Sequence, residues 1–261
     1  MSSQPASSRM FRGDSMEVAS VGSHPEVSVQ AEAEALLLLK RTKELQRYRA
    51  SNEVDTKVRS PLRLYACYGK RPFDILFSVT FLLLVGIWLF PLIALAIRLD
   101  SRGPILFRQR RVGLNGETFS CLKFRTMTHD PQARFAQAQK NDPRITRVGA
   151  FLRRSNFDEL PQFINVLLGD MSVVGPRPHV AELDHVFADV VPGYVLRNRV
   201  RPGVTGLAQV SGCRGETRSV RDMTHRIRFD TFYCRTVSFT MDLKIIVLTV
   251  LRALQGDEKA Y

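Results

Sequence analysis

One uncharged stretch dominates the hydrophobic pattern of the chain. Residues 75–97 form a run of 23 residues without a charged side chain. At about 1.5 Å per residue, a helix of this length crosses a hydrocarbon core of roughly 30 Å. A buried helix of a soluble protein would normally show a polar face, and this stretch shows none. The pattern therefore predicts a membrane-inserted helix, which we assign to residues 70–98.

The flanks of this stretch indicate how it enters the membrane. Lys70 and Arg71 precede it, and Arg98 and Arg102 follow it. Positive charge at both ends favours the cytoplasmic side for both. Pro91 lies inside the stretch, where it removes a helical N–H and clashes with the preceding turn. These observations favour a bent, re-entrant helix. The alternative, a kinked spanning helix, would place everything after residue 97 outside the cytosol, against the charge rule.

Weaker patterns outline the rest of the chain. Residues 105–107 and 118–124 are β-like, and residues 160–168 and 241–254 have helical spacing. They predict a mainly helical α+β fold with little sheet: a small cytosolic membrane-surface domain, residues 99–256, with amphipathic helices. The last helix, 14 residues with three charges, is too short and too charged to span a membrane, and the alternative is a core helix.

The helix at residues 160–168 has the clearest boundaries. One helical face carries its apolar side chains, which are Leu160, Phe163, Ile164, Leu167 and Leu168. Gly169 is placed to end the helix. Because Pro161 is tolerated only in a first turn, we expect the helix to begin near Asp158 or Glu159, with both carboxylates at its N-terminus.

The first 60 residues read as an extension of the domain. Residues 1–28 are rich in Ser, Gly, Pro and Glu and show no helical or strand period, which predicts a disordered tail and no secretory signal. Residues 30–50 are strongly helix-forming. This second segment would lie on a membrane, pair with a partner helix or remain a peripheral surface helix.

The net charge of the chain indicates which classes of molecule it binds. Lys and Arg total 38 against 25 Asp and Glu, a net charge of +13. The excess requires a polyanionic neighbour: nucleic acid, phosphorylated substrates or anionic lipid. No helix-turn-helix, zinc-finger or RNP-type motif is present, so nucleic acid is the weakest candidate. The four Cys are scattered without a CxxC pair, which excludes a disulfide framework and argues against a Cys/His zinc site. Thiols of this kind fit a reducing compartment.

The excess charge is concentrated in two regions. Residues 98–154 contain 13 Lys and Arg against four acids, and residues 197–235 contain nine Arg against three acids. Such regions form a face on anionic lipid, or an arginine site for phosphate oxygens, and the two interpretations are compatible.

The adjacent carboxylates of Asp158 and Glu159 follow Arg153 and Arg154. Plain N-terminal capping explains many acids at such positions. An Asp–Glu pair beside arginines also suits Mg²⁺ and a diphosphate, because Mg²⁺ takes one or two carboxylates and completes its shell with phosphate oxygens. An ionised Asp can in addition attack phosphorus and form an acyl phosphate.

Seven segments in this order resemble the bacterial sugar transferase family, the monotopic phosphoglycosyl transferases. They are KRPFDI, the Pro-broken apolar helix, PILFRQRRVGLNGETFSCLKFRTM, DPRITRVGAFLRR, FDELPQFINVLLGDMSVVGPRP, RPGVTGLAQVSG and FDTFYCRTVSFTMDLKII. The resemblance runs over residues 70–246, about two-thirds of the chain.

The resemblance implies a reaction and a site. The enzyme would transfer a sugar-1-phosphate from a UDP-sugar to polyprenyl (undecaprenyl) phosphate, releasing UMP and initiating exopolysaccharide or other glycoconjugate synthesis. Asp158 matches the nucleophile that forms a covalent phosphosugar intermediate, and Glu159 its partner on Mg²⁺. The resemblance assigns substrate binding to eight further residues: Lys123, Arg125, Arg153, Arg177, Arg201, Gln209, Asp230 and Tyr233.

The resemblance also implies a location and partners. It places the protein on the cytoplasmic face of the bacterial inner membrane, as a monotopic protein in contact with anionic lipid. A homo-oligomer and downstream glycosyltransferases are further candidate partners, and the transferred sugar is not identified. Two positions depart from many relatives: Phe90 stands before Pro91 in place of Ser, and Thr236 in place of Asn. The alternative function is a non-catalytic membrane-anchored scaffold for polysaccharide assembly.

Overall fold

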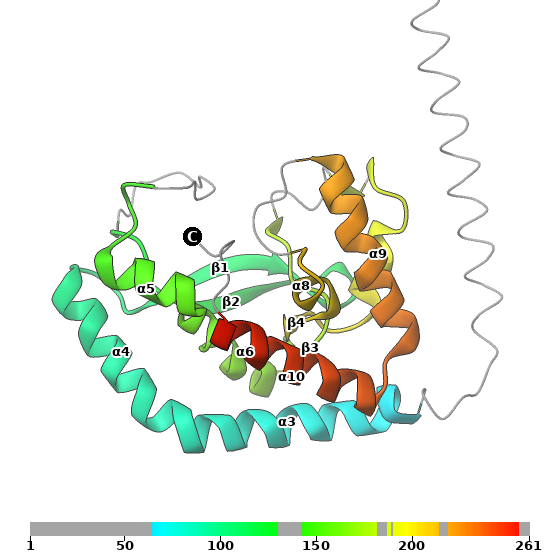
Figure 1. Ribbon diagram of the computed structural model, residues 1–261, viewed down its shortest axis with the longest axis horizontal. Helices are drawn as coiled ribbons and strands as arrows, with labels where there is room; N and C mark the ends of the chain where they lie inside the picture. Colours follow the sequence, from blue (N-terminus) through cyan, green and yellow to red (C-terminus); the bar gives the residue numbers. More distant parts are fainter. Residues whose placement is uncertain (1–63, 130–141, 182–186, 189, 214–218, 256–261) are drawn as a thin grey trace, which may run out of the picture. The chain divides into compact units, whose positions relative to one another are not determined.

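A long, bent helical segment runs along one edge of the domain (Figure 1). The computed structural model describes residues 64–129, 142–181, 187–188, 190–213 and 219–255. The predicted tail and the helix expected at residues 30–50 lie outside the described residues. The segment Tyr65–Asp100 is helical over 36 residues, long and apolar enough to cross a membrane by length and composition. It consists of a π-turn (η2, Tyr65–Gly69), α3 (Lys70–Phe81), a second π-turn (η3, Leu82–Gly86) and α4 (Ile87–Asp100).

The predicted bend in the apolar segment is present. In Figure 1, α3 and α4 run in different directions. The wide turn η3 separates the two helices, and Pro91 lies one turn into α4. A π-turn and a proline are both recognised causes of helix bending. The bend by itself does not distinguish a re-entrant helix from a kinked spanning one.

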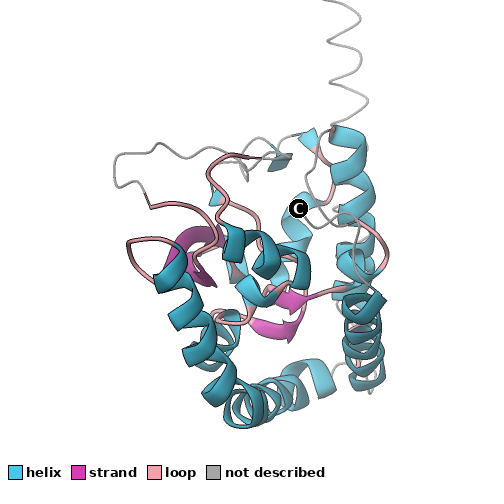
Figure 2. Ribbon diagram, turned by 60° about the vertical axis from the view of Figure 1, so that its left-hand side comes forward, coloured by secondary structure: helices cyan, strands magenta, loops and turns pink. Residues whose placement is uncertain are grey.

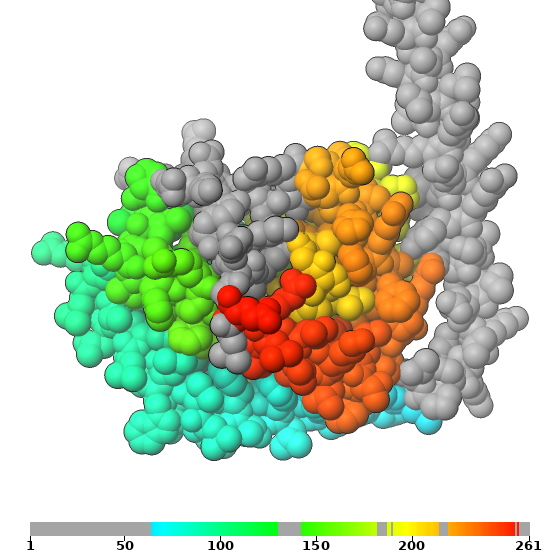
Figure 3. Space-filling model, viewed as in Figure 1, coloured from blue at the N-terminus to red at the C-terminus, as the bar shows by residue number. Residues whose placement is uncertain are grey.

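Large apolar side chains of α3 and α4 point away from the protein. Leu76, Trp88 and Leu92 are examples, and the side chain of Trp88 is 73% exposed. In the space-filling view, the two helices form a continuous edge of the domain (Figure 3). An apolar surface of this extent is typical of a site that contacts lipid or another protein.

The described residues form two small sheets, as the expected α+β class requires. β1 (Leu106–Val112) and β2 (Thr118–Phe124) pair antiparallel, with Leu106 opposite Phe124. β3 (Ser172–Val174) and β4 (Gly203–Thr205) pair parallel. The β-like runs of the sequence are thus confirmed, although β1 extends five residues beyond residue 107. Pairing with β2 holds this polar part of β1 extended, which local hydrophobicity could not indicate.

Helices surround both sheets (Figure 2). In chain order, the remaining helical elements are η4 (Leu114–Gly116), α5 (Arg147–Ser155), η5 (Phe157–Glu159), α6 (Gln162–Leu168), η6 (Tyr194–Arg199), α8 (Leu207–Val210), α9 (Val220–Thr236) and α10 (Phe239–Gln255). Gly169 ends α6 at φ 100°, as expected. The predicted helices at residues 160–168 and 241–254 therefore exist, as α6 and α10.

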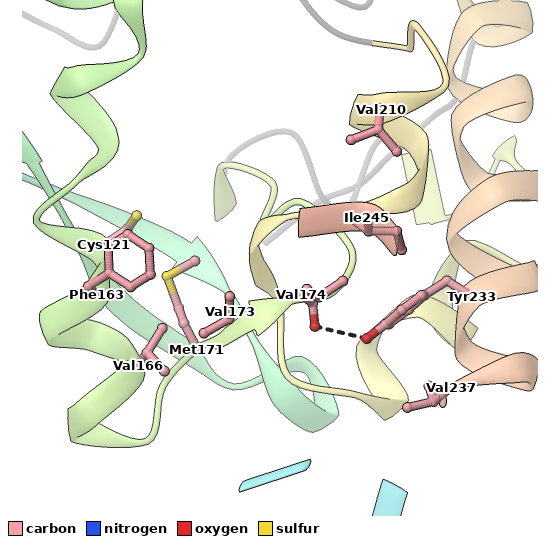
Figure 4. Packing of buried hydrophobic residues seen from close by; sticks show 10 residues of the cluster. All are labelled: Cys121, Phe163, Val166, Met171, Val173, Val174, Val210, Tyr233, Val237 and Ile245. Atoms are coloured by element: carbon pink, nitrogen blue, oxygen red, sulfur yellow. Dashed lines mark hydrogen bonds between the residues drawn. The ribbon is translucent and has the colours of Figure 1, made fainter. Parts of the chain in front are cut away.

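The main core joins α6, β2, β3, α9 and α10 (Figure 4). Cys121 and Phe163 lie on one side of it, and Val174, Tyr233 and Ile245 on the other. The Tyr233 hydroxyl donates to the Val174 carbonyl at 3.0 Å. The membrane segment joins this core through α3, because its Phe77 and Phe81 rings pack on Phe163, the latter at 4.3 Å between centroids.

A buried carboxylate ties the start of the membrane segment to α10. Asp242 is 0% exposed and accepts hydrogen bonds from Tyr65 (2.8 Å), Lys70 (2.7 Å) and Tyr233 (2.7 Å). Helix α10 buries Ile245 and leaves Leu243 and four other large apolar residues exposed. It therefore combines both alternatives, a core helix and an amphipathic surface helix.

Candidate active site

Asp158 and Glu159 lie in a separate short turn between α5 and α6. Asn156 ends α5 in the left-handed conformation, at φ 62°. The 3₁₀ turn η5 (Phe157–Glu159) follows, and α6 begins only at Gln162, after Pro161. The expectation that the carboxylates occupy the first turn of this helix was therefore wrong. Pro161 occupies the N-cap position of α6, so both carboxylates precede the helix.

Glu159 is held by two cations. Its side chain accepts a forked pair of hydrogen bonds from Arg177, at 2.8 Å to Oε2 and 2.5 Å to Oε1. Lys123, on β2, donates to Oε1 at 2.8 Å. Glu159 is 8% exposed, and burial alone would raise the pKa of its carboxyl. The charges and hydrogen bonds of Arg177 and Lys123 outweigh burial and hold the pKa well below the ordinary value.

Asp158 is different. It is half-buried, and its carboxylate accepts no hydrogen bond from any residue that the structure describes. Burial raises the pKa of Asp158, and the charge of Glu159 adds to this shift, while Lys123, Arg153 and Arg177 oppose it. The pair is therefore asymmetric, with one fixed, neutralised carboxylate and one unpaired carboxylate of increased basicity.

A third cation completes the surroundings of Asp158. Arg153, on α5, donates from Nε to the Thr126 hydroxyl at 2.8 Å. Its terminal nitrogens have no partner among the described side chains. Burial lowers the pKa of Arg153, and the nearby charge of Asp158 offsets part of the effect. The turn thus lies among three cations, two of them already engaged with Glu159, in an arrangement suited to phosphate oxygens.

Two further arginines hold the loop that carries Arg177. Arg111 donates to the Pro178 carbonyl at 2.5 Å, and Arg197 donates to the Arg177 carbonyl. Asp230 is buried beside Arg197 at 3.3 Å, and burial raises its pKa. The expected site residue Asp230 therefore lies behind Arg177, joined to the Asp158–Glu159 pair only through Arg197 and the loop.

Other expected site residues lie apart from the carboxylate pair. Arg201 donates to the Gly169 carbonyl at 2.8 Å, at the opposite end of α6. Tyr233 bonds to Asp242 and Val174 in the core. Burial and the charge of Asp242 raise the pKa of Tyr233 well above the ordinary value.

Arg125 and Gln209 also make contacts elsewhere. Arg125 is buried and donates to the Ser101 carbonyl at 2.7 Å, just after α4. Gln209, on α8, lies 3.5 Å from the Val204 carbonyl. These contacts position the loop after the membrane segment and the turn before α8. Substrate binding by Arg125, Gln209, Arg201 and Tyr233 stays a prediction.

The structure adds site residues that the sequence did not single out. Thr126 orients Arg153, while Arg111 and Arg197 orient Arg177. His179 directly follows this loop and contacts Arg197. The only sequence signal was the excess of arginine. Nothing in local spacing indicates that β1 and η6 converge on one loop.

The family model of the bacterial sugar transferases matches residues 65–256. The chain belongs to this family. The resemblance seen in the sequence motifs is thereby confirmed, and the matched region contains the membrane segment and every residue of the site described above.

The chain shares between 39% and 47% sequence identity with three relatives in the family. The chain is 47% identical over 194 residues to a Klebsiella pneumoniae UDP-glucose:undecaprenyl-phosphate glucose-1-phosphate transferase, covering 74% of this chain and 42% of the relative. It is 47% identical over 190 residues to the Rhizobium leguminosarum exopolysaccharide production protein PSS, covering 71% of this chain and 94% of the relative. It is 39% identical over 210 residues to an Aeromonas hydrophila UDP-N-acetylgalactosamine-undecaprenyl-phosphate N-acetylgalactosaminephosphotransferase, covering 78% of this chain and 47% of the relative. The chain thus spans less than half the length of two of these relatives.

The two carboxylates suit a magnesium ion only together with a substrate. The described part of the chain contains no group of three or more His, Cys, Asp and Glu that could hold a metal ion. Among the described residues, none donates to the oxygens of Asp158, and one donates to Glu159 Oε2, which leaves that oxygen a lone pair. One or two carboxylate oxygens plus phosphate oxygens are the donor set that Mg²⁺ prefers, so the pair fits the ion.

Proposed function

We propose that this protein transfers a sugar-1-phosphate from a UDP-sugar to polyprenyl (undecaprenyl) phosphate and releases UMP. The observation that carries the proposal is the asymmetry of the carboxylate pair. Asp158 is unpaired and basic, and it lies beside a Glu159 that two cations neutralise. The names of the relatives from Klebsiella and Aeromonas describe transfer of this type to undecaprenyl phosphate.

In the first half-reaction, a carboxylate oxygen of Asp158 attacks the sugar-proximal phosphorus of the diphosphate. The bond from that phosphorus to the bridging oxygen breaks, and UMP leaves with the electron pair. The product is an acyl phosphate that links Asp158 to the sugar phosphate. Lys123, Arg153 and Arg177 bind the phosphate oxygens and stabilise the charge that develops on them.

In the second half-reaction, an oxygen of the lipid phosphate attacks the same phosphorus. The acyl phosphate bond breaks, Asp158 regains its carboxylate, and the sugar is joined to the lipid through a diphosphate. Mg²⁺, held by Asp158 and Glu159 Oε2, would neutralise diphosphate charge in the complex.

The membrane segment supports a location at the lipid headgroups. We propose that it is re-entrant, enters and leaves by the cytoplasmic face of the bacterial inner membrane, and makes the protein monotopic. Positive charge on both flanks and the bend around η3 support this topology. The contacts of Phe77 and Phe81 with Phe163 hold α6, and therefore the turn before it, at a fixed distance from the membrane helix.

The biological role follows from the acceptor. A polyprenyl-linked sugar is the first product of a polymer, and the Rhizobium relative is named an exopolysaccharide production protein. We propose that this chain likewise performs the initiating step of exopolysaccharide or other glycoconjugate synthesis. Anionic lipid, a second copy of the chain and downstream glycosyltransferases remain the expected partners.

UMP release from a panel of UDP-sugars with a polyprenyl phosphate acceptor tests the proposal. The panel begins with UDP-glucose and UDP-N-acetylgalactosamine, the donors that the names of the two relatives indicate. We expect release with at least one donor, and label from a sugar-labelled donor on Asp158. Asp158→Asn should abolish both, since an amide does not form the acyl phosphate. A parent protein without UMP release from any donor would favour the non-catalytic scaffold. UMP release without protein label would exclude the covalent route.

A further inference from the structure

His179 carries a buried hydrogen-bond donor that no described residue accepts. Its Nδ1 contacts Arg197 Nη1 and lies 2.5 Å from the Tyr194 hydroxyl. A guanidinium nitrogen can only donate, so Nδ1 must accept and the proton of the neutral ring must be on Nε2. His179 is 8% exposed, and Nε2 is buried without a partner among the described residues. An unpaired buried N–H is costly, so this donor requires an acceptor other than the described residues.

The surroundings of this donor are strongly positive. Four arginines act electrostatically on His179, and we call them the arginine cluster: Arg111, Arg177, Arg197 and Arg226. Within the described structure, Glu159 forms an ion pair with Arg177, and Asp230 forms one with Arg197. Burial and the charges of Arg177 and Arg197 lower the pKa of Arg226 to about 10. Burial and the cluster also lower the pKa of His179 well below its ordinary value, so the ring stays neutral.

The cluster is continuous with the carboxylate pair. Glu159 binds Arg177, the backbone of Arg177 binds Arg197, and Arg197 binds His179. This series of contacts leads away from Asp158. In a phosphoryl transfer, the attacking and leaving oxygens lie roughly in line, so the leaving group points away from the nucleophile. A leaving nucleoside phosphate also gains negative charge as the bond breaks, which suits a site where four arginines act on the donor.

We propose that His179 Nε2–H, with the arginine cluster, binds the phosphate of the leaving nucleoside monophosphate. This inference rests on the proposed function and deepens it, because it assigns the leaving-group end of the donor to described residues. His179 donates to a phosphate oxygen, and the cluster stabilises the charge on the departing UMP.

A matched pair of substitutions tests the proposal. His179→Asn keeps an acceptor near the position of Nδ1 and removes the Nε2 donor, whereas His179→Gln places an amide N–H near Nε2. The control is His225→Asn, which removes an exposed histidine on α9. Calorimetric titration of the full-length proteins in lipid nanodiscs measures the Kd of UMP, uridine and inorganic phosphate. Near-ultraviolet circular dichroism reports whether each variant is folded.

We expect His179→Asn to weaken UMP about tenfold to a hundredfold, the value of one hydrogen bond to a charged group. Inorganic phosphate should weaken by a similar factor, uridine should be unchanged, and His179→Gln should recover most of the loss. The His225→Asn control should match the parent. UMP binding by His179→Asn as tight as that of the parent would overturn the proposal, and so would a loss confined to uridine, which would assign His179 to the base.

A measurement on the parent protein covers the case in which both variants fail to fold. Long-range ¹H–¹⁵N spectra of ¹⁵N-histidine protein identify the neutral Nε2–H form of His179, and UMP should slow exchange of that proton. Unchanged exchange at saturating UMP would rule the contact out. A parent that releases UMP from a UDP-sugar while His179→Asn binds UMP normally refutes this inference alone. A parent that neither binds UMP nor releases it refutes the proposed function.

Discussion

Replacing Arg177 by Lys keeps the positive charge but removes the forked pair of hydrogen bonds to Glu159, so it tests these two contributions separately. Arg177 supplies two of the three hydrogen bonds that Glu159 accepts, at 2.8 and 2.5 Å. Lys has a single terminal nitrogen and cannot form the planar fork, so at least one charge-assisted bond is lost. Such a bond contributes about 1.5–3 kcal/mol. If the loss falls on the transition state, turnover drops about tenfold to a hundredfold, since about 1.4 kcal/mol corresponds to a factor of ten.

Arg110→Lys is the matched control for this change. Arg110, an exposed residue of β1, makes one described side-chain hydrogen bond, to the Thr118 hydroxyl at 3.0 Å. A lysine can still donate to that hydroxyl, so we expect about 1 kcal/mol of lost stability at most and unchanged turnover. The assay is UMP release at saturating UDP-sugar and lipid phosphate, with vesicle flotation to verify membrane association. Equal losses in the two variants, or full activity of Arg177→Lys, would refute the inference from the fork.

Three further predictions concern the same region. Glu159→Gln should lower the free energy of unfolding by about 3 kcal/mol, because it leaves buried cations unpaired. Asp158→Asn should change the free energy of unfolding by less than about 1 kcal/mol, and chemical denaturation of the two variants checks this contrast. Lys123→Gln should move the acid limb of the pH–turnover profile to higher pH. Of the charges that lower the raised pKa of Asp158, that of Lys123 has the largest effect, and only the ionised Asp158 can attack. An acid limb that does not move would count against Asp158 as the titrating nucleophile. Two proteins with a single cysteine each, the exposed native Cys67 in one and Asn115→Cys in the other, test the topology. Both cysteines should react with an impermeant reagent from the cytoplasmic side. Labelling of only one of them from outside the cell would refute the re-entrant topology.

The elements that could be predicted from the sequence are those fixed by local pattern. The apolar periodicity of α6, the stop at Gly169 and the long uncharged helix need no distant partner, and each is present. The same holds for β2, whose β-like run matches the strand at both ends. In each case the hydrophobic pattern and the turn chemistry favour the same structure.

The site could be predicted only in part, because long-range contacts decide the position of each side chain. Asp158 and Glu159 were found as a pair, but their opposite environments depend on Arg177, 18 residues from Glu159, and on Lys123, 36 residues away. The sequence also indicates Arg201 and Tyr233 as site residues, but their described contacts lie elsewhere. Arg201 donates to a carbonyl at the end of α6, and Tyr233 bonds to the buried carboxylate of Asp242.

The asymmetry of the carboxylate pair depends on how the membrane segment is attached. Phe81 packs on Phe163 of α6, and Asn165 of the same helix accepts from the Leu122 amide (2.9 Å) and donates to the Ser120 carbonyl (2.9 Å). Helix α6 therefore fixes β2, and with it Lys123, relative to the membrane helix. In the proposed reaction, the lipid phosphate stays in the headgroup layer, so Asp158 must be held at that depth while Glu159 stays neutralised. The contacts from α3 through α6 to β2 meet both requirements, because they fix the positions of Lys123 and of the turn that carries the two acids.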